Sequence, residues 1–330
     1  VGVAVLLALC LMFIGVMAQI LKGGAHLIEW RLFVYDLLGY HLGALTYILW
    51  IALVFFFASL TANRFLTHIV SIAIYFIILL TYELGLAEEL RFAYGAVPGI
   101  EDYSEISGYG IWKKAAFWYY LMWLTVASTL VLLGILFWNR GTTKKWSRRL
   151  RFSGKQLSLT GKIAIALFLA LFFVLQNYIV EKVNVPGNFN SSTIKEKEAA
   201  DYEANYRYLK ARANPNYHNL DLVFNIYPLE RRASYTAKIL LVNDTSDLID
   251  TLFLNFREHV KVDKLTINKK DVGPILNEDP HKSYLYQLPH TMMPGDSTFL
   301  SLIGEKNYNG FPQSGDEPQP DLMFNGSFGK

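Results

Sequence analysis

The chain has 330 residues, of which 52% are hydrophobic and only 18% are charged, and its formal net charge at pH 7 is +3. This composition is too apolar for an ordinary soluble enzyme. The net charge is no argument for a nucleic-acid partner, because the basic residues are not spread over one domain, and we expect no such partner. A single cysteine, Cys10, excludes a disulfide framework and a cysteine-based metal site within the chain.

Five stretches in the first half are long and apolar enough to cross a bilayer, whose hydrocarbon core of about 30 Å needs roughly 20 helical residues. They are Val1–Leu21, Gly43–Leu60, His68–Leu86, Ala115–Trp138 and Ile163–Val180. Between the first two, Gly24–Tyr40 mixes charged and apolar residues and predicts a helix that lies at the membrane interface. Residues 1–181 are therefore predicted to form a membrane domain with the lipid bilayer as its partner.

The charges of the loops predict the orientation of these helices. Asn139–Lys162 is rich in lysine and arginine and has no acidic residue, whereas Ala87–Lys114 has an excess of acidic residues. Because basic loops stay in the cytoplasm, the first loop is expected inside and the second outside. The last helix then runs outward, so that everything after Glu181 is expected to be extracytoplasmic.

The predicted spans hold no Asp, Glu, Lys or Arg in their central portions. Ion-coupled transporters need ionisable groups at membrane depth, so any transport by this bundle is expected to take its energy from elsewhere. Glu83, Gln176 and Asn177 lie near the outer ends of their helices, where we expect them to cap or pack.

Short segments of Phe13–Arg140 resemble the later part of an ABC exporter permease of the second type. These segments are Tyr35–Gly39, Ala62–Phe65, the outer loop Tyr103–Trp112 with Gly108-Tyr109-Gly110, and the basic exit after Trp138. The resemblance implies a separate cytoplasmic ATPase subunit as a partner. Arg64 and the cluster Arg140–Arg151 are its candidate contacts. The alternative is a generic helical membrane anchor.

After Glu181 the pattern changes. Residues 182–213 predict a polar linker, Asn184–Ser192, and a charged helix, Ile194–Arg212, with apolar residues at three- and four-residue spacing. Residues 214–330 then alternate with a period of two and predict an all-β antiparallel sandwich or saddle. The predicted strands are His218–Tyr227, Ser234–Val242, Leu248–Phe256, Val260–Ile267, Tyr284–Leu288 and Ser297–Ile303. The predicted fold class is thus mixed, a polytopic α-helical membrane bundle followed by a β domain.

The stretch Tyr202–Ile303 resembles the N-terminal saddle domain of the aminopeptidase N family of zinc metallopeptidases. The matching segments are Tyr202–Tyr206, the strand Leu220–Tyr227, Pro228–Arg232, Val242–Thr245 and Pro294–Ser297, with Asn325–Phe328 after them. The resemblance implies that a catalytic domain follows this domain in cis.

The zinc-binding motif of such a peptidase does not occur in this chain. Two His at i and i+4 of a helix would bind the metal and the intervening Glu would act as general base. The two nearest His, His281 and His290, are too far apart, and His259 is interpreted as a surface residue at a strand start. We therefore assign no catalytic, cofactor-binding or metal-binding residue, and expect zinc only in a catalytic domain outside the chain. Glycosylation sequons at Asn190, Asn243 and Asn325 are expected to be inert in a bacterium.

The leading hypothesis is a fragment of a multi-pass protein of the bacterial inner membrane, an ABC transporter permease fused to a periplasmic zinc aminopeptidase. Two alternatives stay open. One is a membrane-anchored aminopeptidase without transport, and the other is a membrane receptor or scaffold with a ligand-binding β-sandwich. A His-Glu-x-x-His motif in the following stretch of the reading frame would exclude the receptor.

Overall fold

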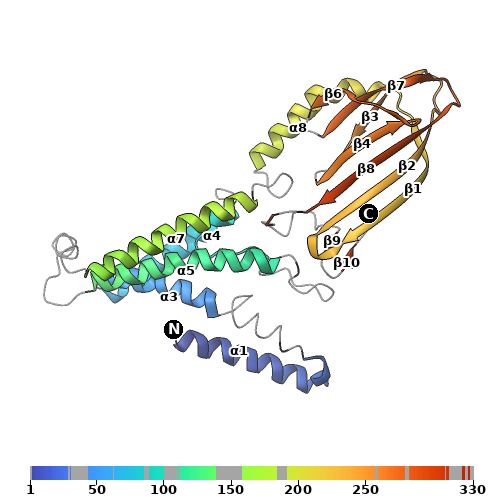
Figure 1. Cartoon of the computed structure of the whole chain (residues 1–330). Coiled ribbons are helices and arrows are strands. Elements are labelled where there is room, and N and C mark those ends of the chain that lie inside the picture. Colours follow the sequence, from blue (N-terminus) through green and yellow to red (C-terminus); the bar gives the residue numbers. More distant parts are fainter. Residues whose placement is uncertain are drawn as a thin grey trace. The chain divides into compact units, whose positions relative to one another are not determined.

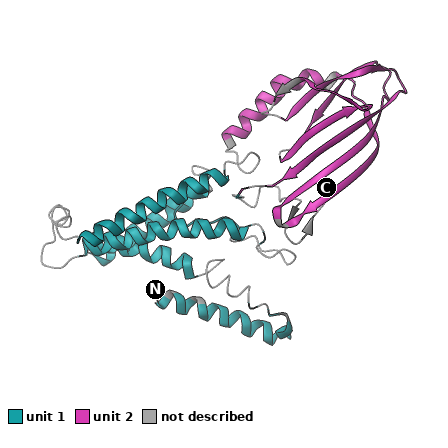
Figure 2. Ribbon diagram, in the orientation of Figure 1, with its two compact units in different colours: residues 1–183, 311–316 teal, residues 184–310, 317–330 magenta. Residues whose placement is uncertain are grey.

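The computed structural model describes residues 2–28, 30, 44–61, 63–84, 89–99, 110, 112–138, 158–183, 192–256, 259–278, 282–308, 310–311, 322–323 and 326–327. Most of the predicted interfacial helix Gly24–Tyr40, nearly all of the outer loop Tyr103–Trp112, the basic loop up to residue 157 and most of the linker Asn184–Ser192 lie outside the described residues. The chain forms two compact units, residues 1–183 with 311–316 and residues 184–310 with 317–330 (Figure 2).

The first unit is helical (Figure 1). Its helices are α1 (Gly2–Leu21), α3 (Ala44–Thr61), α4 (Arg64–Glu83), α5 (Trp112–Phe137) and α7 (Leu159–Val183), with short 3₁₀ turns η1 (Ala25–Leu27) and η2 (Leu90–Phe92). By length and composition, α3, α4, α5 and α7 are able to cross a membrane, and α1 contains a shorter apolar stretch, Val5–Leu21.

Helix α4 begins four residues earlier than the sequence predicts, at Arg64 rather than at His68. The reason is an N-cap, because the Oδ1 atom of Asn63 accepts a hydrogen bond from the backbone N–H of Phe65 at 3.0 Å. The cap satisfies a donor that the first helical turn leaves without a partner, so the helix extends through Arg64 despite its charge.

Helices α3 and α5 form the centre of the first unit, where Leu49, Tyr119 and Met122 are fully buried. A glycine allows their close approach, because a Cβ atom on Gly134 would lie 2.7 Å from the ring of Phe55. The loop after α4 contacts α5, because Nε1 of Trp123 in α5 donates a hydrogen bond to the carbonyl of Ala96 in the loop at 2.7 Å.

The end of α7 is covered by a residue from much later in the chain. Phe311 belongs to the first unit, is only 3% exposed and donates its backbone N–H to the carbonyl oxygen of Lys182 at 2.9 Å. Its ring lies 6.0 Å from that of Tyr178. The contact satisfies one of the terminal carbonyls that every helix leaves without an intrahelical donor.

The second unit begins with α8 (Ser192–Tyr206) and the 3₁₀ turn η3 (Arg207–Ala211). The predicted helix Ile194–Arg212 is thus two elements, because the last turns tighten as helix ends commonly do. Tyr206 and Leu209 are buried there. Just after them, the side-chain amide of Asn214 pairs with the backbone of Phe253, accepting from its N–H at 3.1 Å and donating to its carbonyl at 3.4 Å.

The remainder of this unit consists of antiparallel sheets, as the alternating pattern predicts. Its strands are β1 (Asn216–Tyr227), β2 (Arg232–Val242), β3 (Ile249–Asn255), β4 (Val260–Ile267), β5 (Lys270–Asp271), β6 (Pro274–Glu278), β7 (Ser283–Met292), β8 (Ser297–Asn307), β9 (Leu322–Met323) and β10 (Gly326–Ser327), with η4 (Pro228–Glu230) between β1 and β2. The larger sheet has the order β1-β2-β8-β4-β5, a second has β3-β7-β6, and β9 pairs with β10. Figure 1 labels these strands except β5.

The two larger sheets share one hydrophobic core. Its fully buried members come from β2, β3, β4 and β8: Leu241, Ile249, Leu252, Ile267 and Leu300. Strands β7 and β8 are longer than predicted, reaching Met292 and Asn307. The core covers β2, β8 and β4, where Val260 and Val262 pack against it as partly buried residues, whereas every residue of the edge strand β1 stays exposed.

Candidate functional site

Among the described residues, no group of three or more His, Cys, Asp or Glu side chains is placed to hold a metal ion. His259 lies immediately before β4, with its ring 4.6 Å from that of Tyr308. In the first unit, the Oε1 atom of Gln176 is buried and accepts no hydrogen bond from the described residues. The described part of the chain therefore offers polar networks, an apolar surface and a groove as its candidate sites.

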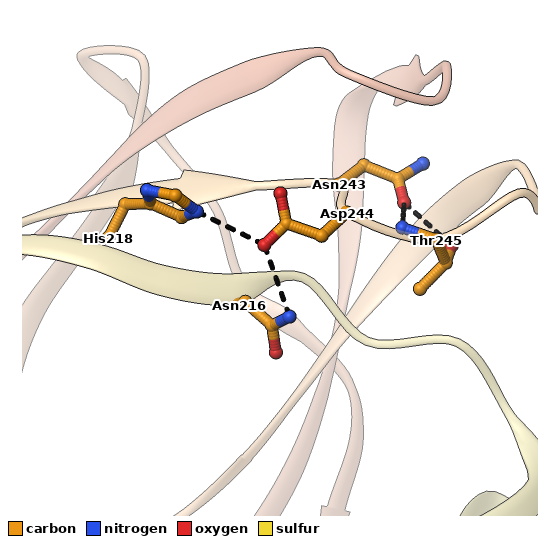
Figure 3. A network of polar contacts seen from close by, with 5 residues as sticks. All are labelled: Asn216, His218, Asn243, Asp244 and Thr245. Atoms are coloured by element: carbon orange, nitrogen blue, oxygen red, sulfur yellow. Dashed lines mark hydrogen bonds and ion pairs between the residues drawn. The ribbon is translucent and has the colours of Figure 1, made fainter.

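The turn after β2 contains a buried polar network (Figure 3). Asn243 is fully buried, and its Nδ2 donates to the carbonyls of Asp247 at 2.8 Å and Met292 at 3.0 Å. Its Oδ1 accepts from the N–H of Thr245 at 3.0 Å and from the hydroxyl of Thr245 at 2.7 Å. Because both Nδ2 donors are used inside the fold, the sequon at Asn243 cannot accept a glycan in the folded protein.

The neighbouring Asp244 joins this turn to the beginning of β1 (Figure 3). Its Oδ2 lies 3.1 Å from Nε2 of His218 and accepts from Nδ2 of Asn216 at 3.2 Å. These hydrogen bonds, first that of His218 and then that of Asn216, lower the pKa of Asp244. The carboxylate therefore acts as a clamp between two strands in its ionised form.

We expect Asp244→Asn to lower the thermal unfolding midpoint of the β unit at pH 7. A carboxyl group whose pKa is lower in the folded protein stabilises it above the unfolded-state pKa, about 3.9, and loses this effect as the pH falls through the folded-state pKa. The difference in unfolding midpoint between Asp244→Asn and the wild type should therefore become smaller as the pH falls below 4. Midpoints measured by circular dichroism from pH 7 to pH 3 check this, and His218→Ala should reduce the difference. A difference that stays constant over this range would contradict the clamp.

Strand β1 has an apolar side that nothing in the described structure covers. Its register places Leu222 opposite Ala237 and Phe224 opposite Tyr235, so these side chains point to the same face as the core residues of β2. Every residue of β1 is nevertheless exposed. We use the name β1 face for the four core-facing residues Leu220, Leu222, Phe224 and Ile226, which are 54%, 44%, 45% and 45% exposed.

Sequence reasoning missed this surface. The alternation of Leu220–Tyr227 predicts a strand, which β1 confirms, and the pairing places its large apolar residues on the core side of the sheet although they remain exposed. The sequence contains no sign that the smaller sheet ends before it reaches β1. A contiguous apolar patch on an edge strand is typical of an interface, because such patches are otherwise a risk for aggregation.

The opposite edge of the larger sheet borders a groove of about 610 Å³. Val260, Val262, Tyr284 and Tyr286 contribute to its lining, together with charged residues of β4 and β8. Burial raises the pKa of Tyr286 above its ordinary value. In the core beside it, burial and the charge of Asp263 raise the pKa of Tyr235 to about 12.

No protein-family model matches the chain, and no curated relative matches it. Among solved structures, an M1 zinc metallopeptidase from Deinococcus radiodurans is similar to 29% of this chain, with 16% identity and a TM-score of 0.25. A two-domain M1 zinc metallopeptidase variant bound to L-tryptophan shows the same identity, coverage and TM-score. In both comparisons the similar region spans 21% of the metallopeptidase chain.

Proposed function

We propose that the chain is the membrane part and the first extracytoplasmic domain of a bacterial inner-membrane protein that carries a zinc aminopeptidase. In this proposal the helices of residues 1–181 form a permease-like bundle, residues 182–213 link it to the periplasm, and residues 214–330 form a saddle-like β domain. The catalytic domain with its zinc ion is encoded beyond this chain, so the chain itself has no peptidase activity.

The β1 face is the observation that supports this proposal. Four large side chains point to the core side of the sheet but meet no second layer. Burying apolar surface stabilises a protein by roughly 25 cal/mol per Å². A further domain that packs on β1 would complete the core, and the aminopeptidase resemblance of Tyr202–Ile303 favours a catalytic domain as that layer.

The proposed transport function rests on the character of the helices. The described spans have exposed apolar side chains along α4 and α7, which provide surface for lipid and for further helices. A separate ATPase would bind on the cytoplasmic side, near Arg64 and the cluster Arg140–Arg151. The same β1 face would serve a membrane-anchored peptidase that transports nothing, so transport and peptidase docking are separate parts of the proposal.

A cysteine-labelling experiment tests the docking part. In a Cys10→Ser background, Leu222→Cys is expected to react rapidly with a maleimide reagent in the present chain and slowly in the protein encoded by the complete reading frame. Lys269→Cys, on the exposed turn between β4 and β5, is the matched control and should react in both. Equal labelling of position 222 in both proteins, or a complete reading frame without His-Glu-x-x-His, would overturn the proposal.

A further inference from the structure

The edge of β4 that faces away from β8 is paired over only part of its length. On this edge β5 pairs with Thr266 and Ile267, and the N–H of Val272 donates to the carbonyl of Leu265 at 3.4 Å. The chain then departs through Gly273 to β6 in the other sheet. Among the described strands, none pairs with residues 260–264 on this side.

The backbone polar groups of this segment point outward at alternate residues. The carbonyl of His259 accepts from the N–H of Asn307 at 3.0 Å, and the carbonyl of Lys261 accepts from the hydroxyl of Tyr235 at 3.3 Å. These carbonyls are therefore directed toward β8. In an antiparallel strand the residues between them, Val260 and Val262, direct their N–H and C=O groups to the opposite edge.

The groove of about 610 Å³ lies along this edge and is lined by side chains from both faces of β4. Val260 and Val262 lie opposite Lys306 and Gly304, and a bulge after Val262 keeps them on the core side with Leu265. Lys261 and Lys264 line the groove from the other face. A strand added in the plane of the sheet would contact side chains on both faces of β4. The volume of the groove is within the range of ligand pockets, about 300–1,000 Å³.

Two further properties define the chemistry of a ligand. The Oδ1 atom of Asn307, which lines the groove, is buried and accepts no hydrogen bond from the described residues, so it suits an N–H donor. The rim is close to neutral, because Lys261 pairs with Asp263 at 3.0 Å and Lys264 with Asp271 at 3.2 Å. Recognition would thus depend on backbone groups and apolar side chains rather than on charge.

We propose that this groove binds an extended peptide segment of a partner chain as an additional strand on β4. Residues 260–264 span about 17 Å at roughly 3.3 Å per residue, which accommodates about five peptide residues. The peptide pairs with the outward N–H and C=O groups of Val260 and Val262, and its alternate, apolar side chains contact these valines and Tyr286. This mode is strand addition, in which main-chain hydrogen bonds supply affinity and alternate side chains supply selectivity.

The competing interpretation is a protected edge. Natural proteins use lysines and bulges to prevent edge strands from pairing with other chains, and β4 has both. A protected edge differs from a binding edge in one measurable respect, because it gives no saturable peptide binding. The proposal is independent of the proposed peptidase partnership, which concerns β1 at the opposite edge of the same sheet.

The test uses the whole chain in lipid nanodiscs and a fluorescent, end-capped peptide of alternating valine and threonine, with binding followed by anisotropy. Val262→Pro removes the outward N–H of residue 262 and leaves the hydrogen bonds between β4 and β8 in place. Proline is tolerated at such a position, because the N–H that it lacks faces away from the sheet. Losing this bond should weaken binding about tenfold. A peptide with proline at alternate positions is the matched ligand control and should not bind, whatever the stability of the variant.

Saturable binding by the wild type, weakened by Val262→Pro and absent for the proline peptide, supports the proposal. Three results overturn it. One is no saturable binding by the wild type, and another is equal affinity for both peptides. The third is a dimer of the chain itself that Val262→Pro dissociates while no peptide binds, which would make a second copy the occupant.

Discussion

Gly304→Ala should destabilise the β unit by about 2–4 kcal/mol, because this glycine lies where a side chain and a backbone cross. A Cβ atom there would lie 2.1 Å from the carbonyl oxygen of Lys261 and 2.7 Å from the hydroxyl of Tyr235. The missing side chain lets Tyr235 extend from β2 across β8 and donate to Lys261 on β4. The free energy of unfolding from urea titration, followed by tyrosine fluorescence, measures the effect.

Two further variants show how much of the destabilisation by Gly304→Ala comes from the steric clash and how much from the lost hydrogen bond of Tyr235. Gly273→Ala is the matched control, since a Cβ atom there would meet nothing within 4 Å, and it should leave the unfolding free energy nearly unchanged. Tyr235→Phe removes only the hydrogen bond and should cost about 1 kcal/mol. A Gly304→Ala protein as stable as wild type would show that β2, β8 and β4 do not approach each other as closely as described.

Asn243→Leu should destabilise the β unit by about 3–5 kcal/mol, the second large effect. The substitution leaves the carbonyls of Asp247 and Met292 and the N–H of Thr245 without the partners they have now. Each buried polar group without a hydrogen bond costs about 1–3 kcal/mol. The midpoint of chemical unfolding, compared at constant slope, gives the loss.

Asn243→Asp distinguishes the contribution of the Nδ2 donor from that of the Oδ1 acceptor. The aspartate keeps the acceptor for Thr245 but places a negative charge against two carbonyl oxygens. We expect a similar loss of stability at pH 7 and a partial recovery in acid, since a protonated carboxyl group donates one hydrogen bond. A variant whose deficit is the same at pH 7 and pH 4 would contradict this account of the network.

Local sequence patterns predicted the long elements and missed the short ones. Alternation over seven or more residues marks β1, β2 and β4, whereas β5 has two residues and carries no period. The length of α8 was overestimated because the apolar spacing continues through η3 although the hydrogen-bonding pattern changes. The antiparallel sheets are confirmed, and the number of membrane spans stays a prediction.

The candidate sites depend on contacts that no local pattern contains. The dipeptide Asn243-Asp244 predicts a turn. It does not predict the hydrogen bond from the buried Asn243 side chain to the carbonyl of Met292, which lies 49 residues away. The β1 face exists because the smaller sheet ends before it covers β1. The groove exists because β5 leaves β4 after two residues, a departure decided by where β6 pairs.

The contact between Phe311 and the end of α7 has a consequence for the order of folding. The hydrogen bond from Phe311 to Lys182 closes a loop that contains α8 and strands β1 to β8. Closing so long a loop in a disordered chain is entropically unfavourable, and the penalty grows with the logarithm of its length. Once the sheets have formed, most of that entropy has already been lost. We therefore expect α7 to form first, the sheets to fold next, and Phe311 to dock last.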